Sequence, residues 1–211
     1  MKQSVFLIIM ILLLVSCDNN KVDYGYDIYY KEIVTVTDKN LFTLDNGKTA
    51  ISVNESVTSS LNVGDRILLH YTLLDEKISG YDYTIRINGL ARIPQIALSP
   101  VSPEDIESRA NEPIQFESVW IGSHFLNMQF YIDFKSEAHS IALLTDSTKL
   151  DNDTIYIYFA HNSNNDPPGS PSHLYISFDL QEVLGKPENN KPLLVNVNTS
   201  NYGNKTYELK Y

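Results

Sequence analysis

The sequence predicts an all-β protein: a small OB-like barrel followed by an immunoglobulin-like β-sandwich. Short apolar segments alternate with polar residues along most of the chain, and Asn, Asp, Gly and Pro recur between them. The 14 Tyr and 8 Phe, against 3 Met and 1 Trp, favour strands because aromatic side chains pack well on a pleated surface. With 211 residues, the chain is long enough to form one or two hydrophobic cores.

The first segment is typical of a bacterial lipoprotein signal. Residues 5–15 form an unbroken apolar run that is too short to span a bilayer but fits a secretory signal. Leu14-Val15-Ser16-Cys17 then resembles the lipobox, in which a small residue precedes a cysteine that is lipidated. We predict cleavage between Ser16 and Cys17, lipidation of Cys17 and anchoring in the outer membrane. The alternative is an ordinary signal peptide followed by a chance cysteine.

The residues after the signal predict two β domains on a tether. Asn46-Gly47 between apolar segments indicates a hairpin, and residues 67–73 and 83–87 alternate as strands do. Proline then recurs at positions 94, 100, 103 and 113, and Ser102-Pro103-Glu104-Asp105 favours one capped helical turn. We therefore predict a signal at 1–16, a lipidated tether at 17–28, a barrel at 29–98, a linker at 99–112 and a sandwich at 113–211.

The predicted sandwich opens with the clearest alternation in the chain. Leu126, Met128, Phe130, Ile132 and Phe134 should face the core, and the residues between them should face water. Further strands are expected at 140–144, 154–160, 173–178, 193–198 and 206–209, with a helical turn at 179–182 that ends at Gly185. About six strands separated by turn residues favour a β-sandwich.

Several short motifs resemble the NigD-like lipoproteins of Bacteroidetes. They are, in order, the lipobox, Gly64-Asp65-Arg66, Pro113-Ile114, the stretch from Trp120 to Met128, Phe159-Ala160-His161-Asn162 and Ile176-Ser177-Phe178-Asp179-Leu180. The resemblance covers essentially the whole mature chain. It implies an N-terminal OB-like domain and a C-terminal β-sandwich, and it attaches no molecular activity to the family.

The charge balance and the missing motifs exclude several classes of function. The formal charge is -10, which disfavours nucleic acid as a partner. The chain has no Gly-x-Ser-x-Gly elbow, phosphate loop, dinucleotide fingerprint or His-Glu-x-x-His motif, so we predict no catalytic residues and no cofactor.

No metal site is predicted either. The five histidines, which are His70, His124, His139, His161 and His173, show no pair at ligand spacing. Asp151 and Asp153 could begin a calcium loop, but the glycine and the distal glutamate of an EF-hand are missing, and a plain turn fits better.

Trp120 is the one tryptophan, and it fits either a sugar-stacking surface or a core anchor, of which the core role is preferred. Tyr24, Tyr26, Tyr29 and Tyr30 cluster beside the tether, where they fit an edge strand covering the barrel better than an adhesive patch. Ser147 and Thr154 lie in sequences that resemble the O-glycosylation acceptors of Bacteroidetes, and Ser147 is the better candidate.

Together these features predict a non-enzymatic, lipid-anchored protein of the cell envelope that acts as a binding module. Its partners would be the membrane, through the lipid anchor, and a protein or glycan ligand. One alternative, which follows from the family resemblance, is a bacteriocin-associated immunity or envelope-protection lipoprotein. The least favoured alternative is a hydrolase whose site is dispersed over loops such as residues 161–172.

Overall fold

The computed structural model describes residues 28–54, 58–187 and 190–211. Within these ranges the regular structure is almost entirely β, and helices α1 (Pro103–Ser108) and α2 (Gln181–Leu184) are short. None of these helices has the length and apolar character needed to cross a membrane. The predicted signal, Ser16, Cys17 and all of the tether except residue 28 lie outside the described residues.

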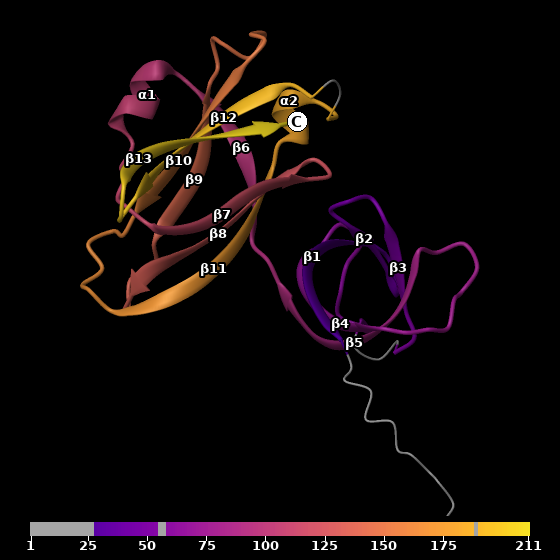
Figure 1. Cartoon of the computed structure of the whole chain (residues 1–211). Coiled ribbons are helices and arrows are strands. Elements are labelled where there is room, and N and C mark those ends of the chain that lie inside the picture. The colour runs from indigo at the N-terminus through magenta and orange to yellow at the C-terminus, as the bar shows by residue number, and fades with distance from the viewer. Residues whose placement is uncertain (1–27, 55–57, 188–189) are drawn as a thin grey trace, which may run out of the picture.

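The N-terminal domain is a closed five-stranded barrel (Figure 1). Its strands are β1 (Tyr29–Asp38), β2 (Leu41–Leu44), β3 (Thr49–Ser52), β4 (Arg66–Leu73) and β5 (Tyr83–Arg92), in the order β1-β2-β3-β5-β4. Alternate residues fill the interior: Val34, Val36, Phe42, Leu44, Ala50, Ile67, Leu69, Tyr71, Ile85 and Ile87. The predicted small barrel of the OB type is confirmed.

The predicted hairpin between β2 and β3 is present, and of its Asn46-Gly47 pair only the glycine adopts the left-handed conformation. Gly47 has a φ of 83°, whereas Asn46 does not have a positive φ. Gly47 N donates to Leu44 O and Leu44 N donates to Lys48 O, which makes a three-residue loop with glycine in the left-handed position. This loop carries Asp45, which is central to the site described below.

The C-terminal domain is an eight-stranded sheet folded over on itself, in the order β13-β12-β10-β9-β6-β11-β8-β7. Its strands are β6 (Gln95–Val101), β7 (Gln115–Gly122), β8 (Phe125–Phe134), β9 (Ser140–Asp146), β10 (Ile155–Asn162), β11 (Ser170–Asp179), β12 (Pro192–Thr199) and β13 (Gly203–Lys210). The end strands approach each other through Phe116 and Tyr207, whose rings stack at 4.3 Å.

The two layers enclose one apolar core, so the predicted sandwich is confirmed. Strand β6 joins the layers because residues 95–97 pair with β11 and residues 98–101 pair with β9. Both pairings are parallel, as is that of β10 with β12, and here the domain differs from the antiparallel sheets of an immunoglobulin domain.

The predicted boundary at residues 98 and 99 is placed too late. Strand β5 ends at Arg92 and β6, which starts at Gln95, already belongs to the sandwich. Residues 99–112 therefore include the end of a strand and the predicted helical turn, which is capped by Ser102 Oγ. The prolines at positions 94 and 100 predict a linker, whereas Pro100 lies within β6. A proline fits there because this part of β6 pairs only with β9, so the missing N–H breaks no second ladder.

The two faces of β8 are not divided as simply as the alternation predicts. Leu126, Met128 and Phe130 are fully buried, as expected, but Phe134 is 43% exposed. Asn127, expected to face water, is also fully buried. The outer face of β8 is therefore covered near its start, and the barrel provides that cover.

We expect Phe130→Ala to lower the free energy of unfolding by about 3–5 kcal/mol, because Phe130 is fully buried and packs edge-on against Phe159. Phe134→Ala on the same strand should change it by no more than about 0.5 kcal/mol. Urea unfolding followed by circular dichroism measures both. Equal losses would show that Phe134, at the end of β8, is as buried as Phe130.

Candidate functional site

Arg66, the first residue of β4, has its side chain fully buried where the barrel meets the sandwich. Its Nη1 forms an ion pair with Asp45 Oδ1 at 2.8 Å and donates to Thr35 Oγ1 at 3.0 Å. The sandwich adds Asn127 Oδ1, which accepts from Nη2 at 2.8 Å, and Ser177 Oγ, which accepts from Nε at 3.3 Å. Because an uncompensated charge is costly away from water, these partners are what allow the guanidinium to be buried.

Asp45 receives two further hydrogen bonds from the sandwich. Trp120 Nε1 and Asn127 Nδ2 both donate to its Oδ2, at 3.0 Å and 2.9 Å. Gly122 allows this approach, because a Cβ at that position would lie 2.0 Å from Asp45 Cγ. In Figure 1 the β7–β8 hairpin, which carries Gly122, reaches toward the barrel. The interdomain node is the set Asp45, Arg66, Trp120, Asn127 and Ser177.

The preferred interpretation of Trp120 as a core anchor between the sheets is wrong. Trp120 is only partly buried, and its indole N–H is directed to the barrel rather than to the sandwich core. It pairs with Asn127, so both side chains leave the same outer face of the sheet.

A pocket of about 370 Å³ lies beside the node, between the two domains. Binding sites occur preferentially at such domain interfaces. The barrel lines it with Lys31, Glu32, Ile33, Leu44, Asp45, Asn46 and Leu68, and the sandwich with Trp120, Gln129 and Tyr175. We call this the interdomain pocket.

A row of rings in contact continues from the pocket along the outer face of the sheet. Tyr131 stacks on His173 at 4.3 Å with an interplanar angle of 10°, and His173 contacts Tyr175 at 4.8 Å. The ammonium of Lys31, from the barrel, lies 5.3 Å from the centre of the Tyr175 ring. Glu117 Oε2 lies 3.0 Å from His173 Nε2 and holds that ring in place. We call Tyr131, His173 and Tyr175 the aromatic ladder.

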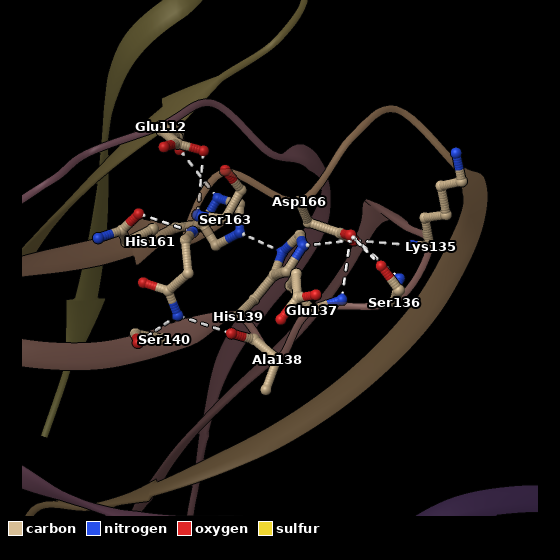
Figure 2. Close-up of polar contacts among 12 residues, drawn as sticks. Glu112, Lys135, Ser136, Glu137, Ala138, His139, Ser140, His161, Ser163 and Asp166 are labelled. Atoms are coloured by element: carbon tan, nitrogen blue, oxygen red, sulfur yellow. Dashed lines mark hydrogen bonds and ion pairs between the residues drawn. The ribbon is translucent and has the colours of Figure 1, made fainter.

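A second polar cluster lies in the sandwich and brings two of the dispersed histidines together (Figure 2). His139 Nδ1 lies 2.9 Å from His161 Nε2, and His139 Nε2 lies 3.3 Å from Asp166 Oδ2. His161 Nδ1 in turn lies 3.3 Å from the carbonyl oxygen of Glu112. We call Asp166, His139 and His161 the histidine chain. Their positions in the sequence share no ligand-type spacing, so sequence reasoning could not group them.

The histidine chain fastens a loop to the end of β8. Asp166, in the loop after β10, accepts backbone hydrogen bonds from Lys135, Ser136 and Glu137 at 2.7–3.0 Å. Burial alone would raise the pKa of Asp166, but these three hydrogen bonds and the one from His139 outweigh it and hold the pKa well below its usual range. The side chains of Asp166 and His139 are 0% and 4% exposed, so a substrate cannot reach either group.

Burial lowers the pKa of His161, and the neighbouring His139 lowers it further, although the carbonyl of Glu112 acts in the opposite direction. If both rings were protonated, each would direct an N–H group at the other. The contact between the two rings therefore requires that at most one of them be charged.

The remaining candidate residues do not come together. His70 contacts the exposed ring of Tyr29, and His124 lies 3.9 Å from Asp179. Asp151 and Asp153 are exposed in the turn before β10. Among the described residues, no group of three or more His, Cys, Asp or Glu side chains is arranged to hold a metal ion.

Of the tyrosines beside the tether, Tyr24 and Tyr26 lie outside the described residues. Tyr29 is 60% exposed, whereas Tyr30 stacks on Tyr71 of the barrel. Ser147 is exposed and Thr154 is half-buried just before β10, and glycosylation of either remains a prediction.

The motifs that suggested a family resemblance converge in space. Arg66 ends the Gly64-Asp65-Arg66 motif, Trp120 and Asn127 come from the longest motif, and Ser177 comes from the last. Models of the NigD-like N-terminal OB domain and the NigD-like C-terminal β-sandwich domain match residues 33–93 and 97–211. The chain belongs to the NigD-like family. Both matched ranges agree with a boundary just before β6.

Solved structures share this two-domain fold. A protein of unknown function from Bacteroides vulgatus is 25% identical, with a TM-score of 0.76 over 87% of this chain and 91% of that one. A NigD-like immunity protein from Bacteroides caccae is 20% identical, with a TM-score of 0.62 over 85% and 90% of the two chains. A candidate lipoprotein from Bacteroides fragilis is 14% identical, with a TM-score of 0.66 over 87% and 98%. No curated protein matches the chain.

Asp45→Asn should lower the free energy of unfolding by about 3–5 kcal/mol, because it leaves the buried guanidinium of Arg66 without a counter-charge. Arg92→Ala, which removes an ion pair whose arginine is 53% exposed, should cost about 1 kcal/mol or less. Chemical unfolding measures both changes. Similar costs would mean that the node does not hold the domains together.

Acid should destabilise the protein through the histidine chain. The pKa of His161 is lower in the folded state, so below about pH 6.5 the unfolded chain takes up a proton that the folded protein excludes. The melting temperature should therefore fall between pH 7.5 and pH 5. His161→Gln, which keeps a donor toward His139, should flatten this dependence, and His70→Gln should not. An equally steep fall in His161→Gln would contradict this assignment.

Proposed function

We propose that this NigD-like protein is a non-enzymatic, lipid-anchored component of the cell envelope that binds a ligand in its interdomain pocket. The observation that carries the proposal is the pocket itself, which takes lining residues from both domains. Because the node fixes one domain on the other, the lining groups are held in position before a ligand arrives. Such preorganisation reduces the entropy lost on binding.

Lipid anchoring is supported by the lipobox at residues 14–17 and by the polar stretch that separates Cys17 from β1. A lipidated Cys17 would hold the barrel close to the outer membrane, with the sandwich beyond it. The candidate lipoprotein of similar fold is consistent with this placement.

A binding role is favoured over catalysis by where the polar groups lie. The histidine chain has the residue types of a proton relay, but its members are buried and occupied in fastening a loop. The pocket is lined by rings, amides, the ammonium of Lys31 and the carboxylates of Glu32 and Asp45, and Asp45 is already paired with Arg66. This set suits recognition better than bond cleavage. In the dispersed-hydrolase alternative, the loop would contribute Asp166, whose side chain is fully buried.

The immunity alternative differs in the kind of ligand. A protein that intercepts a toxin would present a protein-binding surface, and the fold of a NigD-like immunity protein is shared. Photocrosslinking from the pocket in living cells separates this alternative from other ligands, because it identifies the molecule that lies against the pocket.

The test is photocrosslinking in a Bacteroidetes host. Replacing Tyr131 by p-benzoylphenylalanine places the photoreactive group on the aromatic ladder, next to the pocket. Tyr202, which is 76% exposed in the turn between β12 and β13, is the control position. We expect a discrete adduct from position 131 and none from 202. In parallel, Cys17→Ala should move the protein from the membrane to the soluble fraction.

Equal labelling at both positions, or none at 131, would refute a specific ligand at the pocket. A Cys17→Ala variant that stays in the membrane fraction would refute the anchor. A toxin as the partner crosslinked at position 131 would favour the immunity alternative.

A further inference from the structure

The interdomain pocket and the aromatic ladder together form an elongated surface with a defined chemistry. Resting on the proposed function, we propose that this surface binds a neutral oligosaccharide. The groups that would recognise it are the rings of Trp120 and Tyr175, with Lys31, Glu32 and Asn46 as hydrogen-bonding partners.

Flat apolar surfaces are provided by two aromatic rings whose orientation is already fixed. The indole of Trp120 is held by its hydrogen bond to Asp45. The Tyr175 ring is held between the Lys31 ammonium, at 5.3 Å, and the His173 ring, at 4.8 Å. The C–H faces of a pyranose ring pack on such rings, and rings that are already ordered lose little entropy when they bind.

Hydrogen-bonding capacity is left unused around these rings. Within the described part of the chain, Lys31 Nζ, Glu32 Oε1 and Asn46 Nδ2 make no hydrogen bond. Glu32 uses only Oε2, to accept from Tyr71, and Asn46 uses only Oδ1, to accept from the Lys48 N–H. A sugar hydroxyl both donates and accepts, so it can pair with an acceptor and with donors at once.

The charge of the pocket favours a ligand without net charge. Lys31 and Glu32 balance each other, and Asp45 is neutralised by its ion pair with Arg66. The chain as a whole carries a formal charge of -10, which repels a polyanion. Nucleic acids and acidic polysaccharides are therefore poor matches.

The position of the pocket disfavours an extended peptide. Its sandwich wall is the face of strands β7, β8 and β11. Strands β8 and β11 each pair with a neighbour on both sides, and β7, the end strand of the sheet, contributes Trp120 from its face and not its free edge. A peptide that binds as an added strand needs a free sheet edge instead. Of the apolar lining residues, Ile33 and Leu44 are nearly buried and Leu68 is half-buried, so they offer little surface to an anchoring side chain.

The ladder indicates a chain of sugars rather than a single one. The rings of Tyr131, His173 and Tyr175 lie on the outer face of the sheet, and Trp120 lies on the same face at the register of Ser177, two strands away from β11. At about 3.3 Å per residue, the rise from His173 to that register is roughly 13 Å. That length exceeds what one ring covers.

Trp120 is the single tryptophan, so its fluorescence reports on the pocket directly. The full mature chain is titrated with malto-, cello-, xylo- and mannohexaose, with the matching monosaccharides and with hexagalacturonate. We expect at least one neutral hexaose to change the Trp120 emission in a saturable way. Its monosaccharide and the charged hexaose should bind at least tenfold more weakly.

Three variants test the assignment of the surface. Tyr175→Ala should weaken binding of that hexaose at least tenfold, Tyr175→Phe should retain the affinity, and Tyr202→Ala should leave it unchanged. Unaltered circular dichroism spectra show that the variants are folded. An unchanged affinity of Tyr175→Ala would overturn the proposal, as would the absence of binding by all four neutral hexaoses.

The binding function and the identity of its ligand can be refuted independently. A specific adduct at position 131 combined with no oligosaccharide binding would keep the binding function and overturn the ligand class. A protein as the crosslinked species would do the same.

Discussion

The guanidinium of Arg66 is buried at the junction of the two domains, and the rest of the architecture depends on how its charge is compensated. The counter-charge, Asp45, comes from the same barrel, whereas Asn127 and Ser177 of the sandwich complete the hydrogen bonding. The barrel therefore carries an ion pair that the sandwich covers and satisfies. Moving the domains apart would break these hydrogen bonds, so their relative position is specified by polar geometry and not by apolar contact alone.

This constraint explains features that otherwise look unrelated. Gly122 must be glycine because Asp45 lies against it, and Asn127 interrupts the expected solvent-facing side of β8 because it bonds to both members of the ion pair. The hydrogen bond from its N–H to Asp45 holds Trp120 at the edge of the pocket. The pocket is thus a consequence of the same contacts that join the domains.

The residues that could form a proton relay are buried, whereas the accessible residues are those of the pocket and the aromatic ladder. His139, His161 and Asp166 are buried, and they tie a loop to the end of β8. The aromatic ladder and the pocket are open, and they carry rings and hydrogen-bonding groups. This distribution is consistent with the proposed binding function, because an ordered surface loses less entropy when a ligand binds.

The sequence alone determined the fold class, the order of the two domains and most of the strands, because alternation and turn residues are local signals. Its family motifs also contain every node residue except Asp45, but nothing local shows that Arg66, Trp120, Asn127 and Ser177 meet. The predicted linker at Pro100 and the predicted core position of Trp120 are wrong for the same reason, since the role of each residue depends on a partner strand or domain distant in the sequence. The tertiary structure decided the domain boundary, the pairing of His139 with His161 and the pocket, because each depends on contacts between segments that sequence spacing does not relate.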